Sequence, residues 1–98
     1  MNINKDLDGS TLTLTLEGRL DTTTAPQLEA ELKKSISSTV KLILDFMSLE
    51  YISSAGLRVL LSAQKVMNKQ GEMLIRHVND TVMDVFEVTG FVDILTIE

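Results

Sequence analysis

Two adjacent serines, Ser53 and Ser54, are the residues whose type and spacing point most directly to chemistry, and Ala55 and Gly56 follow them. They stand between an apolar segment and an amphipathic one, where we expect a helix to begin. The start of a helix has unpaired backbone N–H groups and a partial positive charge. A serine hydroxyl at this place either caps the helix or carries a phosphate. The sequence leaves both roles open.

Catalysis by either serine lacks the partners that it needs. A serine nucleophile is normally activated by a histidine, and the G-x-S-x-G turn that exposes many such serines is absent. The single histidine, His77, is expected within a strand with an ordinary hydrogen bond. The chain has no cysteine, no histidine cluster for a metal and no glycine-rich phosphate loop. A serine hydrolase is therefore the weakest hypothesis, and we expect neither enzymatic activity nor a cofactor or metal.

Two aspartates each follow an apolar segment that is predicted to be a strand. Asp21 ends the sequence GRLD, and Asp45 ends LILD. If those strands are neighbours, both carboxylates lie at the edge where the helix after Ser53 begins. The alternative for each aspartate is a turn or cap residue that accepts a hydrogen bond from a backbone amide. Taken singly, each aspartate is better explained by that alternative.

Composition limits the architecture and the partners. The chain has 98 residues, of which 44% are hydrophobic, and this is the size of one compact domain, expected over residues 1–98. No apolar run approaches the roughly 18 residues of a membrane span, and residues 1–10 lack the apolar core of a signal peptide, so we expect a cytoplasmic protein with no membrane partner. A net charge of -5 and few aromatic residues argue against nucleic-acid binding. A protein partner is expected, with the chain itself a monomer or a weak dimer.

Strands are predicted from alternating and short apolar runs. Residues 11–17 alternate threonine and leucine until Gly18, and residues 3–7 are expected to form a hairpin with them. Residues 40–44 are predicted to be a central strand covered on both faces, and residues 46–52 a connection. Residues 72–78 form a further strand, and residues 91–98 a terminal strand or an apolar tail on the last helix.

Three helices are predicted from capping signals and apolar spacing. Thr24 and Gln27 fit a capping box at the first helix, which ends in the polar run at residues 35–39. The third helix is capped at residues 79–80 and stops at Gly90. The second runs from Ser54 to a stop at residue 71, and its predicted core stripe is Gly56, Val59, Leu60, Ala63, Val66 and Met67. Leu57 and Leu61 flank this stripe, and they either complete the core or widen the surface for a partner.

The order of these elements predicts an α/β domain with a mixed sheet of four to five strands and about three helices. Strands separated by helices are expected to be parallel neighbours, and the opening hairpin adds an antiparallel pair. Helices should cover at least one face of the sheet. This arrangement places the serines at the junction between the central strand and the second helix.

Three segments together resemble the STAS domain family, whose bacterial members include anti-sigma-factor antagonists. They are GRLDTTTAP, LILDFMSLEYISSAGLRVLL and NDTVMDVFEVTGF, and they extend over nearly the whole chain. The resemblance implies a non-enzymatic domain with a switch serine at the start of its second helix. Ser54 matches that serine, and Asp21 and Asp45 match the acidic positions around it. Family members often have Asp before the serine and Ser or Thr after it, whereas this chain has Ser53 and Ala55, so Ser53 is the alternative site of modification.

The function implied by the resemblance is a phosphorylation-dependent exchange of partners. The unmodified protein would bind an anti-sigma factor that is also a serine kinase, of the histidine-kinase-like ATPase type, and so release a sigma factor. Phosphorylation would end the association, and a serine phosphatase would restore it. The residues expected to contact the partner are Thr22, Thr23, Leu57, Arg58 and Leu61. The alternative is a constitutive STAS adaptor or scaffold subunit of a transporter or a multi-protein signalling complex.

Overall fold

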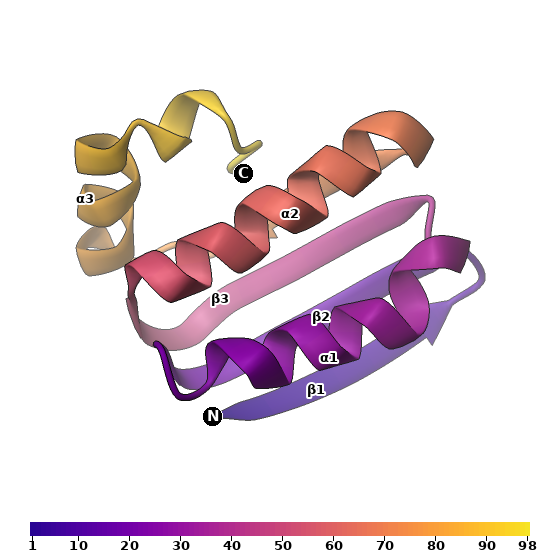
Figure 1. The fold of residues 1–98 in the computed structure, drawn as a ribbon, viewed down its shortest axis with the longest axis horizontal. Coiled ribbons are helices and arrows are strands. Elements are labelled where there is room, and N and C mark those ends of the chain that lie inside the picture. The colour runs from indigo at the N-terminus through magenta and orange to yellow at the C-terminus, as the bar shows by residue number, and fades with distance from the viewer.

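A four-stranded sheet carries two long helices on one face, and a third helix packs near one end of the sheet (Figure 1). The computed structural model of the protein describes residues 1–98. The strands are β1 (Asn2–Asp8), β2 (Thr11–Leu20), β3 (Lys41–Ile52) and β4 (Glu72–Arg76). The helices are α1 (Ala25–Ser35), α2 (Ser54–Gln70) and α3 (Asp80–Thr89), and short 3-10 turns follow α1 and α3 at Ile36–Ser38 and Phe91–Asp93.

The sheet is mixed, as predicted. Its strand order is β1-β2-β3-β4, with β1 antiparallel to β2 and the other neighbours parallel. The tight turn between β1 and β2 uses Gly9 at a positive φ of 62°, a conformation that glycine adopts without strain. β3 is central, as the short apolar run at its start indicated.

The core lies between the sheet and the two helices α1 and α2. The leucines of the alternating β2 segment all point into it, as do most of the apolar positions of α1 and α2 predicted from spacing. Phe46 and Phe86 extend this core toward α3, with their ring centroids 6.4 Å apart. Residues of the core without exposed surface include Leu12, Leu14, Leu16, Leu28, Leu42, Leu44, Leu60 and Met67.

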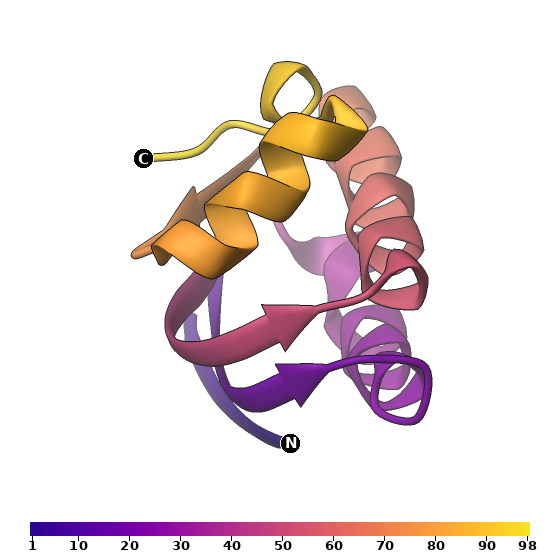
Figure 2. The same cartoon turned by 90° about the vertical axis from the view of Figure 1, so that its left-hand side faces the viewer.

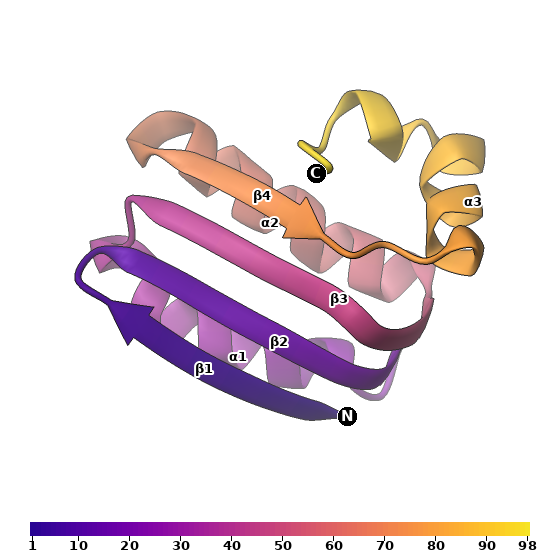
Figure 3. The same cartoon turned by 180° about the vertical axis from the view of Figure 1, so that it is seen from behind.

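The opposite face of the sheet is free of helices (Figure 3). The register places Thr13 beside Ile43 on this face, because their neighbours along each strand point into the core. Ile43 is only 6% exposed, so neighbouring side chains of the sheet are enough to cover it. The central strand is therefore buried on both faces, as predicted, although helices cover only one of them. The predicted first residue of that strand, Val40, precedes it and is exposed.

Both central strands are longer than predicted. β2 continues past Gly18 to Leu20, and β3 continues past Asp45 to Ile52, so the predicted connection at residues 46–52 is strand. The register between the two strands shifts twice, between Thr15 and Glu17 and again after Gly18. At each shift β3 has an extra residue, which interrupts the alternation of buried and exposed side chains. Gly18 permits the second shift with a φ of 107°.

The helix ends agree with most of the capping predictions. Asn79 caps α3 by accepting a hydrogen bond from the Val82 amide at 2.8 Å, and Gly90 ends the helix in the left-handed conformation. The capping box at α1 is wrong, because Thr24 makes no side-chain cap bond. Its hydroxyl instead donates to the Arg19 carbonyl oxygen at 2.7 Å.

The C-terminal segment combines the two predicted arrangements. After the 3-10 turn that follows α3, Leu95 is buried in the core. Ile97 then forms a parallel bridge with Ile75 of β4. A single bridge extends the sheet here, so the tail covers part of the outer edge of β4.

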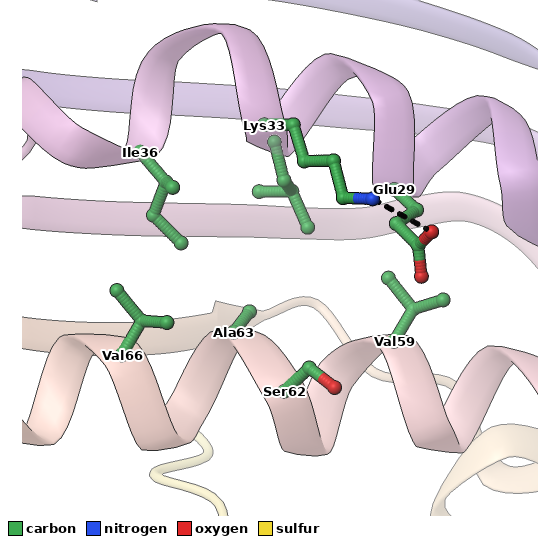
Figure 4. Close-up of a pocket in the computed structure, with 8 residues that line it drawn as sticks. Glu29, Lys33, Ile36, Val59, Ser62, Ala63 and Val66 are labelled. Carbon is green, nitrogen blue, oxygen red and sulfur yellow. Dashed lines mark ion pairs between the residues drawn. The ribbon is translucent and has the colours of Figure 1, made fainter.

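The apolar stripe of α2 differs from the prediction at one position. Val66 is 38% exposed, while Gln64 is buried. Val66 lines a groove of about 220 Å³ between α1 and α2, together with Ile36 and Val59 (Figure 4). The groove leaves Val66 open to solvent because α1 does not pack tightly over this part of α2.

Candidate functional site

The serine pair lies where β3 ends and α2 begins. Ser53 has an extended backbone with φ -102° and ψ 176°, and its amide donates to the Leu20 carbonyl oxygen at 2.9 Å. Its own carbonyl oxygen accepts from the Leu57 amide at 3.0 Å, which closes the first turn of α2. The bond to Leu20 fixes the start of α2 to the end of β2. Figure 2 shows the two strands ending side by side, each leading into its helix.

The two serines differ in the accessibility of their hydroxyl groups. Ser54 is the first residue of α2 and is exposed. The Ser53 hydroxyl oxygen is buried and has no hydrogen-bond partner, and it makes no cap bond to the helix. The cap role predicted for this side chain is therefore not observed. Of the two serines, only Ser54 is exposed, at the positive end of a 17-residue helix.

Because Gly56 has no side chain, the first turn of α2 packs directly against the ends of β2 and β3. A Cβ atom at this position would lie 2.7 Å from Leu20 Cγ and 2.9 Å from Ile52 Cγ1. Both distances are shorter than carbon atoms tolerate, so any larger residue would push the first helical turn away from the sheet. Gly56 thus helps to position the exposed Ser54.

Asp21 organises the turn between β2 and α1, which is the role that the turn alternative predicted. Its Oδ1 accepts from the Thr23 amide at 3.0 Å, from the Thr23 hydroxyl at 2.8 Å and from Thr24. The Thr23 hydroxyl is the main reason that the pKa of Asp21 is lowered. Since Asp21 directly follows Leu20, its turn lies next to the start of α2, as predicted for an acidic neighbour of the serines.

Asp45 lies elsewhere. It is in the middle of β3, and its carboxylate is on the helix-free face of the sheet, whereas the prediction placed it at the strand end beside the serines. Its Oδ1 accepts from the Met47 amide at 3.0 Å and lies 2.9 Å from His77 Nδ1. Burial alone would raise the pKa of Asp45, but the hydrogen bonds from His77 and Met47 outweigh it, so the pKa is lowered. The reason for the different placement is the unexpected length of β3 beyond Asp45.

His77 lies outside the strand in which it was predicted. β4 ends at Arg76, and His77 follows with a positive φ of 58°, which is uncommon for a residue other than glycine. This conformation accompanies the contact of its ring with Asp45. An ionised carboxylate only accepts hydrogen bonds, so Nδ1 of His77 carries the hydrogen. The register pairs Asp45 with Arg76, so the next residue, His77, lies near Asp45.

A second unpredicted contact lies nearer to the serines. The guanidinium carbon of Arg19 is 4.4 Å from the centroid of the Tyr51 ring, and Arg19 Nε is 3.8 Å from Asp21 Oδ2. Arg19 and Tyr51 are paired across β2 and β3 only because of the register shift after Gly18. Sequence spacing gives no sign of that shift, so the contact was not predictable from the pattern.

Four of the residues expected to contact a partner are accessible, and one is buried. Thr22, Thr23 and Arg58 are exposed, and Leu61 is half-buried. Leu57 is only 6% exposed and belongs to the core, which agrees with the structural alternative for this residue. The accessible surface around Ser54 is therefore polar, with Leu61 at its margin.

Two further features of the molecule bear on its chemistry. The structure has no group of three or more histidine, cysteine, aspartate or glutamate side chains arranged to hold a metal ion. None of its helices combines the length and the apolar character needed to span a membrane. The site itself is an exposed serine at a helix start, next to the polar turn that follows β2.

Comparisons with known proteins identify relatives and a shared fold. A relative from Bordetella bronchiseptica, named anti-sigma factor antagonist BtrV, is 37% identical over 99 residues, which cover 99% of this chain and 85% of the relative. The anti-sigma-B factor antagonist of Listeria monocytogenes is 29% identical over 103 residues, which cover 100% of this chain and 90% of the relative. The solved structure of the anti-sigma factor antagonist SpoIIAA in its unphosphorylated form has the same fold, with a TM-score of 0.78 at 18% identity, over 99% of this chain and 87% of that one. The family model of the STAS domain matches residues 2–98, and the chain therefore belongs to the STAS domain family.

Proposed function

We propose that the protein is an anti-sigma-factor antagonist that exchanges partners through phosphorylation of Ser54. In the bacterial cytoplasm the unmodified protein binds an anti-sigma factor that is also a serine kinase, and a sigma factor is released. The kinase then phosphorylates Ser54, the complex dissociates, and a serine phosphatase restores the first state. The observation that carries this proposal is the exposure of Ser54 beside the shielded hydroxyl of Ser53. The names of the two relatives support the part of this proposal that concerns an anti-sigma-factor antagonist.

The start of α2 suits a residue that is reversibly phosphorylated. Its first amide groups have no side-chain cap, so they remain available to phosphate oxygens. The helix end favours an anion by about 0.3 to 1 kcal/mol, which offsets part of the repulsion from the nearby Asp21. Phosphorylation of Ser54 should therefore leave the fold intact.

The same phosphate is sufficient to break a protein interface. It adds about -1.5 to -2 charges. Opposite a partner carboxylate at about 8 Å, with an effective dielectric constant of about 20, two charges cost on the order of 4 kcal/mol, or roughly a thousandfold in affinity. The exposed Thr22, Thr23 and Arg58 and the half-buried Leu61 are the proposed contacts around it. In this account the protein acts by binding and performs no catalysis itself.

The test is the affinity of Ser54→Asp for the anti-sigma factor kinase of the same organism, measured by calorimetry. One added charge should cost about 2 kcal/mol, or roughly 30-fold in affinity. The melting temperature should stay nearly unchanged, because the substituted residue is exposed. Ser62→Asp is the matched control, since Ser62 is an exposed serine further along the same helix. If Ser54→Asp binds as tightly as the unmodified protein, the constitutive adaptor is the better account.

A further inference from the structure

Arg19 is held in a defined position near the start of α2. One face of its guanidinium group lies against the Tyr51 ring at 4.4 Å, and its Nε lies 3.8 Å from Asp21 Oδ2. A guanidinium group stacked on an aromatic ring is restricted before any partner arrives, so it loses less conformational freedom on binding. The Arg19 side chain is nevertheless 59% exposed.

The register shift after Gly18 creates this arrangement. Gly18 pairs with Leu49, and Arg19 then pairs with Tyr51, so Glu50 is the extra residue of β3. In a regular ladder Arg19 would pair with Glu50, and the two opposite charges would lie side by side. The shift replaces a carboxylate by an aromatic ring as the neighbour of Arg19. Its positive charge is therefore supported by the ring and is not neutralised across the strands.

The remaining donors of Arg19 are available to a ligand. The contact to Asp21 is long for a hydrogen bond, and the other oxygen of Asp21 is already engaged by Thr23 and Thr24. The two terminal nitrogens of Arg19 have no hydrogen-bond partner within the protein. A guanidinium fork of this kind binds a carboxylate through two parallel hydrogen bonds. The backbone of Arg19 is close to the proposed site of phosphorylation, because the next residue, Leu20, accepts the hydrogen bond from the amide of Ser53. Leu20 points into the core, so the Arg19 side chain leaves the same strand end on the helix-free face, at the edge of the sheet next to the start of α2.

We propose that Arg19, supported by Tyr51, is the anchor for an aspartate or glutamate side chain of the anti-sigma factor. This inference rests on the proposed function. It adds the kind of partner side chain that the loss of binding on phosphorylation requires. A partner carboxylate bound by Arg19 is brought close to Ser54. A phosphate on Ser54 then meets that negative charge directly, which explains how a local modification ends the association. Arginine and tyrosine are also residue types enriched among those that dominate interface affinity.

The test is the affinity of Arg19→Glu for the purified kinase that phosphorylates Ser54. We expect a loss of about 30-fold or more, because reversing the charge removes an anchored pair and adds a repulsion. Tyr51→Leu removes the support and should weaken binding about three- to tenfold, whereas Tyr51→Phe keeps the ring and should bind normally. Lys65→Glu makes the same change in net charge at an exposed position further along α2 and should also bind normally. Near-UV circular dichroism and melting temperature establish that each variant is folded.

The possible results separate this inference from the proposed function. If the unmodified protein binds the kinase and Arg19→Glu binds equally well, the anchor is wrong and the proposed function stands. If Lys65→Glu weakens binding as much as Arg19→Glu, the effect is one of net charge, and the anchor is also wrong. If the unmodified protein does not bind the kinase at all, both proposals fail. An acidic residue of the kinase whose change to lysine rescues Arg19→Glu would identify the bound carboxylate.

Discussion

Ser53 and Ser54 are adjacent in the chain, but the change from strand to helix gives their hydroxyl groups different surroundings. Ser53 still has the extended backbone of β3, and its hydroxyl oxygen is buried. Ser54 has helical geometry, and it is exposed at the first position of α2. A kinase has to reach a hydroxyl oxygen, so exposure separates two residues that have the same chemistry. This is the physical basis for choosing Ser54 as the site of modification.

At the same scale, the Asp45–His77 contact predicts how stability depends on pH. The pKa of Asp45 is lower in the folded protein than in the unfolded chain, so the ionised carboxylate stabilises the fold. This contribution is fully present above the unfolded pKa of about 3.9, and it is lost as the pH falls through the lower, folded pKa. Replacing Asp45 by asparagine should therefore lower the free energy of unfolding at pH 7, by about 1 kcal/mol.

The measurement for this prediction is urea unfolding of the protein and of Asp45→Asn between pH 3 and 7. The variant should lose less stability than the unmodified protein as the solution becomes acidic. Some acid dependence should remain, because the pKa of Asp21 is lowered as well. Identical losses of stability in the two proteins would show that the Asp45 carboxylate contributes nothing.

At the scale of the elements, the approach of α2 to the sheet depends on Gly56. Replacing it by alanine improves helix propensity by about 1 kcal/mol, but the new methyl group overlaps Leu20 and Ile52. We expect the overlap to dominate and the free energy of unfolding to fall by about 1 to 2 kcal/mol. Ser62→Ala is the control for propensity, since Ser62 is exposed on the same helix. A variant Gly56→Ala that is as stable as the unmodified protein, by urea unfolding, would contradict the close contact.

Both ends of α3 were predictable because their signals are local. Asn79 caps α3 through a residue three positions away, and Gly90 ends it through its own backbone conformation. The ends of the strands were not predictable, because pairing with a distant strand decides where a strand stops. β3 continues for seven residues after Asp45 because β2 pairs with it as far as Leu20.

The same distinction applies to the side chains of the site. Asp21 lies beside the serines as predicted, because its turn directly precedes α1 and is tied to the start of α2. The contacts of Arg19 with Tyr51 and of Asp45 with His77 both depend on the register between strands. One extra residue in β3 changes which side chains meet, and the pattern of apolar residues contains no information about it.

At the scale of the whole molecule, the fold separates Ser54 from the core. The radius of gyration is 12.1 Å, close to the roughly 12.6 Å expected for a compact domain of this length. The core lies between one face of the sheet and the helices, whereas Ser54 lies at an exposed end of that layer. A phosphate added there changes the charge of a surface and displaces no buried side chain. The modification should therefore alter what the protein binds and leave its stability nearly unchanged.

The most direct measurement of the central claim is the site of phosphorylation. The anti-sigma factor kinase of the same organism, with ATP, should add one phosphate to the protein, and fragmentation mass spectrometry should place it on Ser54. Ser53→Ala should still be modified, Ser54→Ala should not, and the phosphorylated protein should melt within a few degrees of the unmodified one. A phosphate on Ser53, or an unchanged mass after incubation with a kinase that binds the protein, would contradict the account.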